Sequence, residues 1–196
     1  MIPINLDPAR LKIALVGNGE RIDRREALLR EGGAAPVRLP ADADFAGFGV
    51  VYVADLPRAA AAGIAARVRA AGALVNVEDE ADLCDFHTPA IVRRGDLTLS
   101  VATGGRCPGL AGALAAYLGR LFDGAWAMRL DLLESKRRRW RGEGLGHRAI
   151  RERIEAHLVQ AAWLPALPAK DAASDLSHSP NNATLRNASL AAGQTR

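Results

Sequence analysis

The chain has 196 residues, of which 49% are hydrophobic and 24% are charged, and its formal net charge is +4. That length suits one substantial domain with a smaller appendage, and the apolar content is sufficient for a buried core. The sequence has no long apolar run and no leader-like N-terminus, so we expect a cytoplasmic protein without a membrane span.

The first half of the chain alternates short apolar runs with helical patterns. Helical patterns lie at 20–30 and 58–71, and strand-like runs lie at 11–16, 36–39, 49–56 and 72–79. Continuous apolar strands separated by helices are typical of a parallel sheet that is buried on both faces. The pattern therefore predicts an open α/β sheet.

The middle and the end of the chain follow a different pattern. Strand-like runs at 89–94 and 97–102, joined by Arg94-Gly95-Asp96, predict either a hairpin or two strands that leave the main sheet. Helical patterns start at Pro108, at about residue 125 and at about residue 146.

The positive charge is concentrated in the last two helical patterns. From residue 134 to residue 153 there are eight Lys or Arg and three Glu, a net charge of +5, so the rest of the chain carries −1. Such a patch indicates an anionic partner (nucleic acid, phosphate or polycarboxylate) or a solvated helix face. No aromatic–basic interleaving accompanies it, so we expect no nucleic acid as the partner.

A glycine motif lies between the first strand and the first helix. Gly17-Asn18-Gly19 stands where a Rossmann unit binds the pyrophosphate of a dinucleotide. A third small residue is expected at position 22 and an acidic residue at the end of the second strand, but Ile22 and Arg38 stand there. The motif is compatible with a modified dinucleotide site or with an α/β fold that has no cofactor.

Three further motifs are candidates for chemistry. Asp79 ends the fourth strand, where a carboxylate can act as a general base or cap a turn. Cys84 and His87 are too few for a zinc site, which needs at least three protein ligands, so no resident metal is expected. The loop 103–108 precedes a helix and can cradle an anion or simply connect two elements.

Several stretches of the chain resemble the precorrin-2 dehydrogenase and sirohydrochlorin ferrochelatase family, which also forms the N-terminal part of siroheme synthase. They are "PINLDPARLKIALVGNGE", "NVED" and "CDFHTPAIVRRGDLTLSVATGGRCPGLAGAL". The resemblance implies a Rossmann-like parallel sheet domain that binds NAD (1–85), a central dimerisation segment with two strands (86–122) and a small helical domain on the substrate side (123–168). Residues 169–196 lack periodicity, and we expect a disordered tail there.

The resemblance also implies an activity. The family oxidises precorrin-2 to sirohydrochlorin with NAD, some members then insert ferrous iron, and the protein is a homodimer. Asp79 is implied as the catalytic residue for both steps. The residues implied at the cofactor are Gly17, Asn18, Gly19, Glu20, Arg21, Arg38, Asp55 and Asn76, and those implied at the tetrapyrrole are Thr103, Gly104, Gly105, Arg106, Cys107, Pro108, Arg137 and Arg138. Arginines are the natural counter-charge for the carboxylates of this substrate.

Three departures from the family fall on the cofactor side. They are Ile22, the short connection 39–49, and "VADLPRAAAAG" in place of a more polar stretch. The features around Asp79 and the loop 103–108 are retained. Two functions therefore stay open: the NAD-dependent dehydrogenase, and a tetrapyrrole-binding relative (carrier, chelatase or regulator) without the NAD-dependent step.

Overall fold

The computed structural model describes residues 2–164. The tail expected at 169–196 lies outside the described residues. The chain divides into two compact units between Leu132 and Leu133, and each unit is described by itself.

The first unit is built on a four-stranded parallel sheet. Its strands are β1 (Ile13–Val16), β2 (Val37–Leu39), β3 (Val50–Val53) and β4 (Leu74–Val77), in the spatial order β2-β1-β3-β4. Every residue of β1 and β3 is buried, which is why these strands are continuous apolar runs in the sequence. The predicted open α/β sheet is confirmed.

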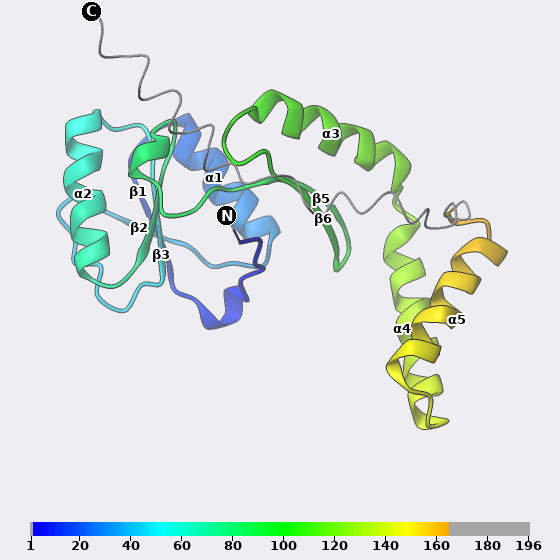
Figure 1. The fold of residues 1–196 in the computed structure, drawn as a ribbon. Coiled ribbons are helices and arrows are strands. Elements are labelled where there is room, and N and C mark those ends of the chain that lie inside the picture. The colour runs from blue at the N-terminus through cyan, green and yellow to red at the C-terminus, as the bar shows by residue number, and fades with distance from the viewer. Residues whose placement is uncertain (1, 165–196) are drawn as a thin grey trace, which may run out of the picture. The chain divides into compact units, whose positions relative to one another are not determined.

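Two helices cover opposite faces of this sheet (Figure 1). Side chains alternate along a strand, so Leu15 and Tyr52 pack with Ile22 of α1 (Glu20–Glu31). On the other face, Val51 and Val75 pack against α2 (Arg58–Ala70), whose buried residues are Ala61, Ile64, Ala65 and Val68. Ile22 is fully buried, so the position expected to hold a small residue instead carries a core side chain.

The connection from β2 to β3 has no helix or strand, as the short sequence predicted. Phe45 fills the space with a side chain that is almost fully buried among the residues that α2 covers. The Arg67 guanidinium of α2 lies over the Phe45 ring and donates to the Ala41 carbonyl, which ties the loop to the helix.

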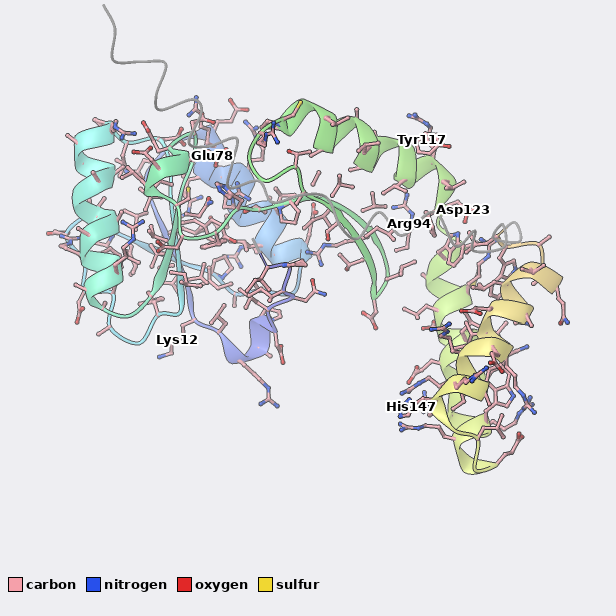
Figure 2. The ribbon with its side chains drawn as sticks, viewed as in Figure 1. Lys12, Glu78, Arg94, Tyr117, Asp123 and His147 are labelled. Atoms are coloured by element: carbon pink, nitrogen blue, oxygen red, sulfur yellow. The ribbon has the colours of Figure 1, made fainter. Side chains whose placement is uncertain are left out.

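A hairpin and a helix follow the sheet. Strands β5 (Ala90–Arg94) and β6 (Leu97–Val101) pair antiparallel across a two-residue turn, so the hairpin is the correct alternative. Helix α3 (Pro108–Leu121) packs on this hairpin. The Arg94 guanidinium donates to the carbonyls of Gly119 and Phe122, both at 2.7 Å, and fixes the end of α3 (Figure 2).

The second unit is helical. Helix α4 (Trp126–Gly142) crosses the boundary between the units, and α5 (His147–Gln160) follows it. Trp140 and Ile150 are buried here, and the Arg153 guanidinium lies over the Trp140 ring, 5.6 Å from its centre. Two 3₁₀ turns, Pro8–Arg10 and Ala81–Leu83, were not predicted.

Candidate functional site

The carboxyl ends of the strands form the candidate site. The chain runs from β1 outward to β2 and then back to β3 on the other side of β1, so the sheet has its switch point between β1 and β3, where open α/β folds bind ligands. A cavity of about 350 Å³ lies at this edge. Its lining includes Arg21, Asp55, Glu78, Asp79 and Glu80. In Figure 2, Glu78 marks this end of the sheet and Lys12 marks the opposite end.

The two glycines of the first loop are required by the close approach of β3. Gly17 has a φ of +129°, and a Cβ atom there would lie 1.9 Å from the Ala54 carbonyl oxygen. Gly19 has a φ of +149°, and a Cβ atom there would lie 2.7 Å from Oδ2 of Asp55. A side chain at position 17 would clash with the backbone after β3, and one at position 19 would be strained and would displace the Asp55 carboxylate, so the loop lies against the residues that follow β3.

Asp55 fills the space beside Gly19. Its Oδ2 accepts hydrogen bonds from the backbone N–H groups of Arg21 (3.1 Å) and Ile22 (3.2 Å) in the first turn of α1. These N–H groups have no partner within the helix, and the helix dipole favours an anion beside them. A carboxylate of the chain thus occupies the place where a Rossmann helix binds phosphate.

Arg21 joins Asp55 to Asp79. Its Nη1 lies 2.6 Å from Oδ2 of Asp79, and its Nε lies 3.8 Å from Oδ1 of Asp55. Both aspartates have positive φ, 56° and 64°, in the left-handed region that Asp tolerates better than most residues. The Asp79 side chain is 71% exposed, whereas that of Asp55 is 20% exposed. The predicted catalytic carboxylate therefore lies in the lining of the cavity and is open to solvent.

The other acidic groups of the cavity have basic partners. Glu78 pairs with Arg25 at 3.5 Å, and Glu80 binds the Arg58 guanidinium. Glu78 and Glu80 were missed at the sequence level, although three consecutive acids after a strand are a usable signal. Among residues 2–164, no three His, Cys, Asp or Glu side chains are grouped closely enough to hold a metal ion.

The remaining loop residues lie at the surface around α1. Asn18 and Glu20 are exposed, and Glu20 pairs with Arg24 at 3.3 Å. Arg38 of β2 donates to Asp23 at 2.6 Å and to Glu26 at 2.7 Å. Burial lowers the pKa of Arg38, but the bonds to Asp23 and Glu26 outweigh it and leave this pKa raised. The Arg38 charge is therefore already balanced within the chain.

Asn76 is placed away from the cavity lining. It is 7% exposed, and its Nδ2 donates to the Phe86 carbonyl at 2.8 Å and to Cys84 at 3.5 Å. The Asn76 amide thus binds the segment that follows β4, at Cys84 and Phe86.

Cys84 also closes this turn. Its Sγ accepts from the Val77 N–H at 3.2 Å and lies 3.1 Å from the Val77 carbonyl oxygen. Burial raises the pKa of the Cys84 thiol, so it stays protonated and acts as a hydrogen-bonding group. His87 lies beside Gly105, since a Cβ atom there would be 3.6 Å from its ring.

The expected substrate residues lie in two places. Thr103 Oγ1 accepts from the Cys107 N–H at 3.2 Å and donates to its carbonyl at 3.0 Å, which closes the loop before α3. Gly104, Gly105, Arg106, Cys107 and Pro108 of this loop are exposed. Arg137 and Arg138 belong to the second unit, where both are exposed and Arg138 pairs with Glu134 at 3.1 Å.

Comparisons with known proteins give consistent matches. A family model described as putative NAD(P)-binding matches residues 23–90, which begins just after the glycine loop. The chain is 35% identical over 133 residues to a siroheme synthase of Methylococcus capsulatus, covering 56% of this chain and 28% of that protein. It is 30% identical over 185 residues to a siroheme synthase of Thiobacillus denitrificans, covering 83% of this chain and 36% of that protein.

The fold also matches a solved structure. The match is to SirC, precorrin-2 dehydrogenase, with a TM-score of 0.61 and 19% identity, covering 81% of this chain and 89% of that chain. At this identity the match shows a shared fold. The chain spans about a third of the length of the two curated relatives, at 28% and 36%.

Proposed function

Since the chain belongs to the family formed by the N-terminal part of siroheme synthase, we propose that it oxidises precorrin-2 to sirohydrochlorin with a nicotinamide cofactor. The observation that carries the proposal is the position of Asp79. It follows β4 in the lining of the cavity at the ends of β3 and β4, it pairs with Arg21 of α1, and its side chain is open to solvent. A carboxylate in this place can take the proton that leaves with the hydride.

We propose that the cofactor binds at the switch point between β1 and β3. Gly17, Gly19 and the N-terminus of α1 offer the shape that a diphosphate needs, provided that the Asp55 carboxylate turns away. When bound there, the nicotinamide cofactor would accept the hydride. We propose NAD rather than NADP, because the Arg38 charge that could attract a 2′-phosphate is balanced by Asp23 and Glu26.

The substrate carries many carboxylates, and we assign their counter-charges to exposed arginines. Arg106 lies in the loop before α3, and Arg137 and Arg138 lie on α4. Among the described residues Arg137 has no ion-pair partner, whereas Arg138 is engaged with Glu134. We therefore expect Arg137 to contribute more to substrate binding than Arg138. Replacing each by Gln and comparing KM for precorrin-2 tests this assignment.

We also propose a homodimer formed through α3. Leu110, Leu114, Tyr117 and Leu121 recur at helical spacing along α3, and all four are exposed in the single chain. The opposite face of α3 packs on β5 and β6, and a two-stranded hairpin is marginal without further packing. A second copy would cover this apolar stripe. Sedimentation of the wild type and of Tyr117→Asp tests the dimer, which the substitution should dissociate.

Ferrous iron is proposed as a second substrate, with Asp79 as the base that removes protons from the tetrapyrrole as the metal enters. We place these reactions in a reducing cytoplasm, in keeping with the two free thiols, Cys84 and Cys107. No helix of the described part of the chain is long and apolar enough to cross a membrane.

The proposal is tested by absorbance spectroscopy with precorrin-2, with and without NAD. The expected result is NAD-dependent formation of sirohydrochlorin. Ferrous salt is then added under anaerobic conditions, and iron insertion is measured by the change in absorbance. One observation favours the alternative of a tetrapyrrole-binding protein without the oxidation step, namely the Asp55 carboxylate at the N-terminus of α1. Tight binding of sirohydrochlorin without NAD-dependent turnover would establish that alternative.

A further inference from the structure

The first turn of α1 already holds an anion that belongs to the chain. Asp55 Oδ2 accepts from two of the helix's unpaired N–H groups, those of Arg21 and Ile22, at 3.1 and 3.2 Å. The Asp55 side chain is 80% removed from solvent, since only 20% is exposed. The carboxylate is therefore held by two directional hydrogen bonds and is partly shielded from water, unlike the groups of an ordinary surface ion pair.

The same carboxylate fills the space that a glycine loop keeps open for phosphate. A Cβ atom on Gly19 would lie 2.7 Å from Oδ2 and 2.8 Å from Cγ of Asp55. The volume above Gly19 is thus taken by the aspartate head group. A diphosphate that used this loop would need the same N–H groups and the same volume.

Charge adds to this competition. Glu78 and Glu80 are compensated by Arg25 and Arg58, which leaves Asp55 and Asp79 to share Arg21. An incoming diphosphate would therefore meet a site with an excess negative charge. Like charges at such distances repel, and the partly buried position reduces screening by water and salt.

We propose that Asp55 is a built-in competitor of the dinucleotide diphosphate, so that nucleotide binding requires its carboxylate to leave the N-terminus of α1. The inference rests on the proposed function for the identity of the nucleotide. It assigns to Asp55 the control of nucleotide affinity, in place of the direct cofactor contact that the family resemblance implies.

Two substitutions separate the charge of Asp55 from its shape. Asp55→Asn removes the charge and suits the positive φ, because Asn is also tolerated there. Asp55→Gly removes the whole side chain and relieves the backbone strain. Glu80→Gln is the matched control, because it removes a carboxylate from the same cavity but not from the helix terminus. Thermal melts of all four proteins establish that each is folded.

The experiment is calorimetric titration with two probes, inorganic pyrophosphate and NADH. Pyrophosphate tests the competition alone, and NADH tests it together with the proposed function. We expect Asp55→Gly to tighten pyrophosphate binding about tenfold or more, equivalent to about 1.4 kcal/mol. Asp55→Asn should give a smaller gain in the same direction, and Glu80→Gln a gain of about twofold at most.

The outcomes are distinguishable. Equal pyrophosphate affinity in the wild type and both Asp55 variants overturns the competitor role, as does an equal gain in Glu80→Gln. If pyrophosphate binding tightens but none of the proteins binds NADH, the competitor role stands and the dinucleotide part of the proposed function fails. If NADH binds the wild type and both Asp55 variants equally, the proposed function stands and the inference fails.

Discussion

The ends of β3 and β4 make an instructive comparison. Each strand is followed by an aspartate with positive φ, and each aspartate reaches Arg21. Asp55 after β3 turns inward onto the backbone of α1, whereas Asp79 after β4 stays 71% exposed with Arg21 as its ion-pair partner. The same residue with positive φ at both places thus has two roles, because β3 pairs directly with β1, the strand that leads into the glycine loop, whereas β4 lies one strand further away.

A position at the carboxyl end of a strand is therefore not enough to make a carboxylate available as a base. A carboxylate bound to helix N–H groups cannot readily act as a base, because its oxygen is already an acceptor in charge-assisted hydrogen bonds. An exposed carboxylate can approach a substrate. The comparison predicts that changes at β4 mainly affect turnover, and that changes at β3 mainly affect ligand affinity and stability.

The largest effect is expected from Asp79→Asn. The side chain keeps its size but loses its basicity, so we expect the oxidation of precorrin-2 to slow by about 10²- to 10⁴-fold. The free energy of unfolding should change by less than about 1 kcal/mol, because the lost ion pair is exposed. Absorbance kinetics and urea denaturation measure the two quantities. Turnover within tenfold of the wild type would contradict the assignment of Asp79 as the base.

Gly17→Ala should destabilise the protein by displacing the backbone that follows β3, and it should leave the end of β4 unchanged. The added Cβ would meet the Ala54 carbonyl oxygen at 1.9 Å, and φ is +129°. We expect a loss of about 3 kcal/mol in the free energy of unfolding, from the steric clash and the backbone strain. Gly63→Ala on α2 is the matched control, because its Cβ would meet no atom within 4 Å. That substitution should stabilise by about 0.5–1 kcal/mol, and a Gly17→Ala protein as stable as the wild type would contradict the clash.

Much of this architecture could be predicted from local patterns. The two fully buried strands, β1 and β3, are continuous apolar runs, and the hairpin follows from two short runs around Arg94-Gly95-Asp96. The two 3₁₀ turns could not be predicted, because three residues carry no periodicity. Position 22 was expected to hold a small residue, yet Ile22 is accommodated in the core beside Leu15 and Tyr52.

The candidate site was predictable in its location but not in its contacts. The sequence placed the glycine loop and Asp79 at one edge of the sheet, because both follow parallel strands. It could not show that Asp55 binds α1, because this contact joins residues 34 positions apart along the chain. It also could not show that the Asn76 amide binds Phe86, since a strand pattern does not reveal which polar group a side chain will meet.

A smaller effect is expected from Cys84→Ala, which loosens the turn after β4. The thiol bonds to both the N–H and the carbonyl of Val77, so its loss leaves a part-buried N–H without its acceptor. We expect a cost of about 1–2 kcal/mol in the free energy of unfolding. Cys107→Ala is the control, because that side chain is exposed and should cost less than about 0.5 kcal/mol. Equal costs in urea denaturation would show that the Cys84 bonds do not hold the turn.

The smallest effect is expected from the ion pairs of Arg21. A double-mutant cycle of Arg21→Gln with Asp79→Asn should give a coupling energy of about 0.2–1 kcal/mol, because the pair is close but exposed. The cycle with Asp55→Asn should give less, since Arg21 Nε lies 3.8 Å away and the backbone N–H groups that hold Asp55 remain in Arg21→Gln. Both couplings should fall in 1 M salt, where the screening length is about 3 Å. A larger coupling for Asp55 than for Asp79 would mean that the guanidinium, rather than the helix terminus, holds the inward aspartate, and the contrast between β3 and β4 would then rest on Arg21 alone.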